Sequence, residues 1–161
     1  MKKLIVALMG AASVFAASGA YAQSSQSGTF NVNITLTPKC TLSSITAVDF
    51  VYTSFQPGVQ NSTAGDFTVT CTTSLPYTFG LQAGTGAATP PGSASINVTD
   101  NAVGLQYVLN APAAGVGNGT TGTALNVAGT MAAGQSGTCA AGPTCSNTAA
   151  TNKTQTLIVN Y

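Results

Sequence analysis

The strongest constraint on the fold is a strict two-residue alternation between Gly28 and Cys40. From residue 30 to residue 36 every second position holds a large apolar side chain: Phe30, Val32, Ile34 and Leu36. Asn or Thr stands between them, a period typical of a β-strand with one buried face. Pro38 cannot donate a ladder hydrogen bond and closes the run. The sequence therefore predicts a strand whose apolar face is covered either by the chain's own domain or by a neighbouring subunit.

Residues 1–22 match an export signal. Lys2 and Lys3 supply a basic end, an apolar run follows from Leu4 to Ala17, and residues 20–22 fit cleavage between small side chains. A membrane anchor is the alternative, but the apolar run is shorter than a spanning helix. We expect the mature chain to begin at Gln23, with an N-terminal extension over 23–38 and one β domain over 39–161.

Charged residues are sparse in this chain. Beyond the signal it holds two lysines and three aspartates, and the whole sequence contains no histidine, arginine, glutamate or tryptophan. Such a surface has little electrostatic protection against self-association, which favours a protein that works in an assembly. It offers no basic patch to nucleic acid or anionic lipid. We expect no nucleic-acid partner, no small-molecule substrate, no metal and no cofactor.

The sequence lacks the usual groups for catalysis. Without His or Glu, acid–base chemistry near neutral pH would fall to lysines, tyrosines or the aspartates Asp49, Asp66 and Asp100. The aspartates lie in no motif, so we interpret them as strand-end or turn residues. Serine and threonine have no histidine partner for a hydrolytic triad. Gly84-Thr-Gly86 and Gly117-Asn-Gly119 resemble phosphate loops only superficially, because no basic residue or helix start follows. We predict that the protein is not an enzyme.

The four cysteines of an exported chain should form disulfides, and three pairings are possible. Cys40 follows the first strand and Cys71 ends another alternating run, so a bridge between them would join two strands. Cys139 and Cys145 flank a Gly-Pro turn, which favours a local bridge. We favour these two pairs. A zinc site is the alternative, but the spacer is unusual for one and no histidine is available.

Beyond Cys40 the sequence predicts short strands separated by turns. We expect strands at 45–53, 66–73, 77–81, 96–98, 103–109, 125–131 and 153–161, and loops at 84–92, 115–122 and 139–152. With the leading strand this makes about eight strands, typical of a β-sandwich, and no segment after the signal has helical spacing. Tyr52, Tyr77 and Tyr107 lie in strand patterns, so we expect core positions rather than a platform for ligands.

Several short motifs together resemble one family. They are Phe67-Thr-Val69-Thr-Cys71, Tyr77-Thr-Phe79-Gly-Leu81, Leu105-Gln-Tyr107-Val-Leu109, Val127-Ala-Gly129-Thr-Met131 and the run from Lys153 to Tyr161. With the strand before Cys40, they resemble the spore coat protein U domain family, which includes the pilins of archaic chaperone–usher pili. The resemblance implies an all-β, incomplete immunoglobulin-like sandwich that lacks its last strand and is completed by donor-strand exchange. A periplasmic chaperone lends a strand during export, and the N-terminal segment of the next subunit replaces it in the fibre.

Carried over by position, the resemblance assigns the donor strand and one disulfide. The donor anchors are Phe30, Val32, Ile34 and Leu36, and the family disulfide joins Cys40 to Cys71. The chain departs from the family where Lys39 replaces a common glycine and where residues 150–152 replace a Gly-Asp-Tyr-like approach to the last strand. The Cys139 and Cys145 pair looks like an addition to the family pattern. These departures leave the subunit's place in the fibre open.

The function implied by the resemblance is that of a structural pilin, which serves surface attachment and biofilm formation. Its expected partners are identical or related pilin subunits, a periplasmic chaperone and an outer-membrane usher. The expected route is export through the periplasm to the cell surface. The alternative is a secreted coat or matrix protein, or a tip-adhesin binding module, that folds as a self-complete sandwich.

Overall fold

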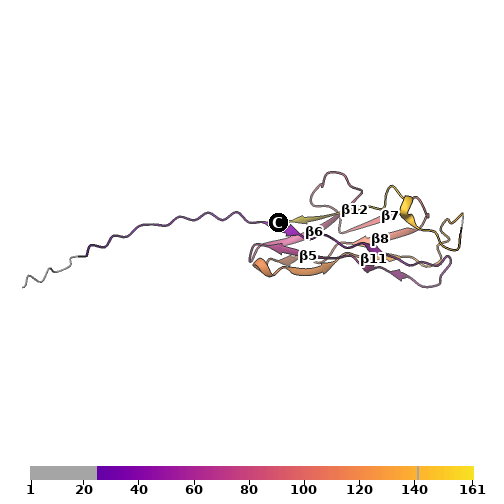
Figure 1. Ribbon diagram of the computed structural model, residues 1–161, viewed down its shortest axis with the longest axis horizontal. Coiled ribbons are helices and arrows are strands. Elements are labelled where there is room, and N and C mark those ends of the chain that lie inside the picture. The colour runs from indigo at the N-terminus through magenta and orange to yellow at the C-terminus, as the bar shows by residue number, and fades with distance from the viewer. Residues whose placement is uncertain (1–24, 141) are drawn as a thin grey trace, which may run out of the picture. The chain divides into compact units, whose positions relative to one another are not determined.

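The computed structural model describes residues 25–140 and 142–161 of the chain. The export signal expected at 1–22 lies outside the described residues. The chain divides after Thr35 into two units, which are described separately. The first unit contains no helix or strand between Ser25 and Thr35. All strands of the described residues belong to the second unit, Leu36–Tyr161 (Figure 1).

The described residues form twelve β-strands and two short 3-10 helices. The longer strands are β5 (Asp66–Cys71), β6 (Pro76–Ala83), β7 (Ser95–Thr99), β8 (Gln106–Asn110) and β12 (Gln155–Asn160). The shorter ones are β1 (Cys40–Leu42), β2 (Val48–Asp49), β3 (Gln60–Asn61), β4 (Thr63–Ala64), β9 (Gly115–Val116), β10 (Thr123–Asn126) and β11 (Ala128–Met131). The helical turns are η1 (Gly119–Thr121) and η2 (Asn147–Ala149). Over the described ranges, no helix has the length and apolar character to cross a membrane.

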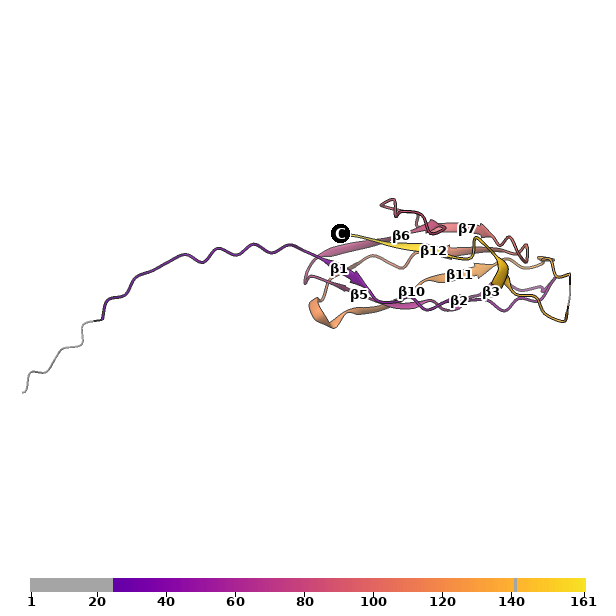
Figure 2. The same ribbon diagram turned by 45° about the horizontal axis from the view of Figure 1, so that its top comes forward.

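Every strand pair of the second unit is antiparallel. β5 lies between β1 and β10, β8 lies between β7 and β11, and β6 pairs with β12 and β9. Beyond β11 the sheet ends in β3, while β2 and β4 pair with each other. Figure 2 shows β6, β7 and β12 in one layer and β1, β5 and β10 in the other. The prediction of an all-β, immunoglobulin-like fold is confirmed.

The core lies between the layers and is built from alternate residues of the two central strands. Its buried members there are Phe67, Val69 and Cys71 from β5, and Tyr77, Phe79 and Leu81 from β6. The rings of Phe67 and Phe79 meet edge to face with their centroids 5.6 Å apart, an arrangement that aromatic pairs prefer. The two-residue period of the sequence therefore identifies the core face of both strands correctly.

The loop between β6 and β7 folds back onto β6. Leu81 and Ser93 exchange two backbone hydrogen bonds of 2.7 and 2.8 Å. Asn160 Nδ2, from β12, donates to the Pro91 carbonyl oxygen at 3.0 Å. This approach requires glycine at Gly80, because a Cβ there would collide with the Pro91 carbonyl. The Pro-Gly loop expected from the sequence is therefore present and is anchored to the sheet.

The prediction of a strand at 45–53 is wrong except at the two residues of β2. Beyond β2 the chain bonds to a loop instead of a strand ladder. Tyr52 Oη donates to the Ala132 carbonyl at 2.8 Å, and Phe55 N donates to the Gln135 carbonyl at 2.8 Å. Phe55 has a φ of 60°, which lies outside the β region. The chain has left the sheet after Asp49, and its backbone turns at Phe55.

Two further expectations differ from the structure. The glycine-rich stretch 115–122 is predicted to lack regular structure, yet it contains β9 and η1. Gly117 lies too close to the Thr72 carbonyl for any Cβ, so this glycine serves close packing. The strand expected at 125–131 is divided into β10 and β11 at Val127, whose N–H donates to the Gly65 carbonyl at 3.0 Å.

The strand expected at 103–109 begins later, at Gln106 in β8, because Asp100 and Leu105 close a turn before it. Asp100 N donates to the Leu105 carbonyl at 2.9 Å. The sequence also misses β1, β3 and β4. Each has three residues or fewer, which is too short to display a period.

Candidate subunit interface

The predicted donor segment has the alternating sequence of a β-strand, but it forms no strand in the described chain. Its four apolar anchors are all exposed, with exposed fractions of 84% for Phe30, 70% for Val32, 86% for Ile34 and 74% for Leu36. The first strand of the described residues is β1, which starts at Cys40. In the described chain, this run is therefore not one of the strands of the domain.

Strand β12 has one sheet neighbour among the described strands. It pairs with β6 over its whole length, from Gln155 opposite Ala83 to Asn160 opposite Thr78. Its other edge carries no ladder in the part of the chain that the structure describes. Unpaired N–H and C=O groups along such an edge can accept a further strand.

Apolar side chains beside this edge are only half-buried. Leu157 and Val159 of β12 pack against the buried core, and Leu42 of β1 does the same from the other layer. Tyr161, directly after β12, is 60% exposed. The side chains at the centre of the sandwich are thus buried, whereas the apolar side chains of β12 that face the core remain partly exposed to solvent.

The Cys40–Cys71 disulfide ties β1 to β5. The two residues are register partners with Cα atoms 4.1 Å apart, and both are buried. Lys39 N donates to Thr72 Oγ1 at 3.0 Å, and Thr72 N donates to the Lys39 carbonyl at 2.9 Å. These bonds fix the backbone at the start of the β domain, immediately after Pro38.

The second disulfide joins Cys139 to Cys145, whose Cα atoms lie 5.5 Å apart. Both residues are exposed, in the long loop between β11 and β12. The pairing is the one that the sequence favours. Because all four sulfur atoms are in disulfides, the zinc-site alternative is contradicted.

The three aspartates lie apart from one another, at strand ends and in a turn, as expected. Asp49 ends β2 and Asp66 begins β5, and both are exposed. Asp100 follows β7 and is only 2% exposed, the sole buried polar side chain of the described residues. Its burial was not predicted from the sequence. The available signal was an Asp-Asn pair directly after an alternating strand, a typical start for a side-chain-closed turn.

The environment of Asp100 keeps its carboxyl ionised. Burial raises its pKa, but hydrogen bonds from the N–H groups of Val103 and Ala102, the amide of Asn147 and the charge of Lys153 lower it. The net result is a pKa below the ordinary aspartate value. The carboxylate is therefore an acceptor at every pH above the usual aspartate range.

The tyrosines have different surroundings. Tyr77 is buried in the core, as predicted. Tyr107 is half-buried, with its ring centroid 5.8 Å from that of Phe50, and its hydroxyl accepts from Gln155 Nε2 at 3.1 Å. Burial raises the pKa of Tyr107, the Gln155 bond lowers it, and the charge of Asp100 raises it, so that the net pKa is raised. These contacts are structural.

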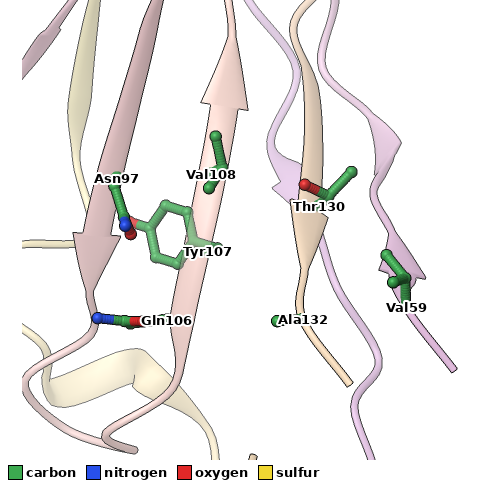
Figure 3. A pocket seen from close by; sticks show the side chains of 7 residues that line it. All are labelled: Val59, Asn97, Gln106, Tyr107, Val108, Thr130 and Ala132. Atoms are coloured by element: carbon green, nitrogen blue, oxygen red, sulfur yellow. The ribbon is translucent and has the colours of Figure 1, made fainter. Parts of the chain in front are cut away.

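A shallow pocket of about 310 Å³ lies on the sheet that contains β7, β8 and β11 (Figure 3). Its lining is made of amide, hydroxyl and apolar groups: Val59, Asn97, Gln106, Tyr107, Val108, Thr130 and Ala132. No charged side chain lines it. Over the described residues, no three His, Cys, Asp or Glu side chains gather in a way that would hold a metal ion.

Comparison with known proteins identifies the family of the chain. The family model described as Spore Coat Protein U domain matches residues 26–159. No curated protein and no solved structure matches the chain. The match includes the alternating N-terminal run, the Cys40–Cys71 pair and β12 except its last residue, and it extends over most of the sequence. The chain therefore belongs to the Spore Coat Protein U domain family.

Proposed function

We propose that the chain is a structural subunit of a chaperone–usher pilus and that it polymerises by inserting residues 30–36 into a neighbouring copy. The Spore Coat Protein U domain is associated with subunits of such pili. The observation that carries the proposal is the exposure of Phe30, Val32 and Ile34, which is 70% or more for each. Three large apolar side chains on one face of a single segment need a partner surface.

The free energy available from that segment is large. Complete burial of one such side chain contributes about 1.5 to 3 kcal/mol, so the four anchors could supply about 6 to 12 kcal/mol as an upper bound. Ordering the segment opposes this gain by about 1 to 2 kcal/mol per residue. New backbone hydrogen bonds and a rigid receiving edge must therefore add to apolar burial for stable insertion.

The free edge of β12 is the proposed receiving edge. A strand added there would provide hydrogen-bond partners for its backbone and would cover Leu157 and Val159, which are half-buried. The lengths are compatible: residues 30–36 would span about 23 Å as a strand, and β12 about 20 Å. The same edge would require protection before assembly. A periplasmic chaperone and an outer-membrane usher, as the family association implies, would supply it.

The proposed organisation of the chain follows from this role. An export signal at 1–22 would be removed, 23–38 would be the donor extension, and 39–161 would be the receiving sandwich. The subunit would be carried through the periplasm to the cell surface, where the fibre serves attachment and biofilm formation. The proposed role is structural and involves no reaction.

The test is a matched pair of substitutions within the donor segment. Ile34→Asp adds a charge on the apolar face, whereas Asn33→Asp adds the same charge on the opposite face of the same strand. A buried unpaired charge costs several kcal/mol, so we expect I34D to reduce multimers of the purified mature chain by at least about a hundredfold. N33D should assemble as the wild type does.

Unheated gel electrophoresis and negative-stain electron microscopy would measure assembly. Multimers of I34D at the wild-type level would refute the donor assignment and favour the self-complete sandwich. Equal loss in I34D and N33D would show that charge in the segment, and not its apolar face, controls assembly.

A further inference from the structure

The start of β12 depends on side-chain contacts. The chain between β11 and β12 is a long loop, and η2 is the one regular element among its described residues. β12 itself pairs with β6 and with no other described strand. The ladder with β6 holds its first residue, Gln155, opposite Ala83, and the contacts at the end of the loop are the other constraint on where β12 starts.

The turn between β7 and β8 binds the end of the loop. Asn152 Nδ2 donates to the Thr99 carbonyl at 2.7 Å, and Asn101 N donates to Asn152 Oδ1 at 3.1 Å. Asn101 and Thr151 exchange two more bonds, of 2.6 and 3.1 Å. Residues directly before β12 are thus fixed to the end of β7 by four hydrogen bonds of the two asparagine side chains and their neighbours.

Asp100 organises this turn from inside. Its Oδ1 accepts from Ala102 N at 2.8 Å and from Val103 N at 2.9 Å, which closes the turn. Its Oδ2 accepts from Asn147 Nδ2 at 3.0 Å, which reaches η2 in the loop. One buried carboxylate therefore joins the β7–β8 turn to the loop that leads into β12.

We propose that Asp100 is a positioning residue that sets the start of β12, and that it thereby prepares the edge that receives the donor strand. The inference rests on the proposed function for the role of that edge. An ionised carboxylate accepts hydrogen bonds and donates none, which matches three converging donors. Asparagine at this position would turn an NH₂ group toward one of those donors, and an unsatisfied buried group is costly.

The ionisation of Asp100 gives the inference a specific pH dependence. Because the pKa of Asp100 is lowered on folding, its contribution is present above the ordinary aspartate pKa and is lost as pH falls through the lowered one. The groups that face it are Lys153, whose charge favours ionisation, and Tyr107 of β8, whose own pKa is raised in part by Asp100.

The test measures local protection in the full mature chain. Asp100→Asn is compared with Asp66→Asn, which makes the same charge change at an exposed residue. We expect amide hydrogen exchange in β12 to accelerate by at least about tenfold in D100N and by less than about twofold in β5. D66N should change neither strand. Asn147→Ala keeps Asp100 and removes one of its donors, so it should also accelerate amide exchange in β12, but by a smaller factor than D100N does.

Unchanged protection of β12 in D100N would overturn the inference, as would an equal loss in β5 and β12, which indicates global destabilisation only. In wild type, β12 protection corrected for intrinsic exchange should fall as pH drops through the Asp100 pKa, and D100N should lack this step. If β12 responds as expected but the wild type never assembles, the proposed function fails while the positioning role stands. If the wild type assembles and amide exchange in β12 is unchanged in D100N, the positioning role fails while the proposed function stands.

Discussion

The two disulfides close loops of different length, which predicts different losses of stability when each is removed. Cys40 and Cys71 are 31 positions apart, whereas Cys139 and Cys145 are 6 apart. On the chain-entropy estimate, each disulfide lowers the conformational entropy of the unfolded chain. This raises the free energy of unfolding by about 4 kcal/mol for the longer loop and by about 2 kcal/mol for the shorter one.

Packing enlarges this difference. Cys40 and Cys71 are 8% and 2% exposed and belong to the buried core, whereas Cys139 and Cys145 are exposed. Alanine leaves a gap where each buried sulfur stood, at a further cost of about 1 to 2 kcal/mol for the pair. We expect C40A/C71A to lower the free energy of unfolding by about 5 to 6 kcal/mol and C139A/C145A by about 2 kcal/mol.

Urea unfolding of the purified mature chain, followed by circular dichroism, would measure both losses. Total stability in domains of this kind is about 5 to 15 kcal/mol, so C40A/C71A should lose about a third of it at the upper end of this range and all of it at the lower end. The C139A/C145A midpoint should move modestly with a similar slope. Equal losses for the two double variants, or a larger loss for C139A/C145A, would refute the reasoning from loop length and burial.

Two further predictions concern the packing around β8. Gly129→Ala should cost about 1 to 3 kcal/mol, because its Cβ would lie 2.7 Å from Phe50 Cζ and 2.8 Å from Leu109 Cδ2; a variant as stable as wild type in urea would contradict this. Tyr107 should ionise above the ordinary tyrosine range, since its pKa is raised on folding. Its contribution to stability is then full below about pH 10 and is lost as pH rises through the raised pKa. Ultraviolet titration against Tyr107→Phe isolates this tyrosine, and a normal titration curve would contradict the prediction.

The alternating strands could be predicted from the sequence because their burial is local information. In β5, Phe67, Val69 and Cys71 alternate with threonine, and all three are buried. A period of two residues states which side chains share a face. It requires several residues to be visible, so the two-residue strands β2, β3, β4 and β9 have no signal of this kind.

The hydrogen-bond network at Asp100 could not be predicted in the same way. Its partners come from the following turn and from Asn147, which lies 47 residues later. The interpretation of Asp100 as a strand-end or turn residue is correct, because its carboxylate closes a turn directly after β7. Its connection to the loop before β12 depends on how distant segments pack, which a single sequence does not encode in any local pattern.

The alternating run at residues 30–36 shows that a two-residue period does not say which surface covers the apolar face of a strand. Phe30, Val32 and Ile34 alternate as Phe67 and Val69 do, yet they are exposed while the β5 residues are buried. The difference is that β5 has a strand on each side, β1 and β10, whereas the N-terminal run has none among the described strands. Under the proposed function each copy carries one unpaired donor strand and one receiving edge, that of β12.

Joining unlike surfaces is a heterologous contact, which continues from copy to copy unless its rotation closes a ring. Donor and receiving edge would be used once in each copy, so assembly would proceed by single additions. A reciprocal exchange between two copies would also satisfy both surfaces, but it would stop at one species of twice the subunit mass. A ladder of regularly spaced multimers from the wild type and from N33D therefore supports the fibre, and a single dimer band would refute open-ended assembly even if the donor assignment is correct.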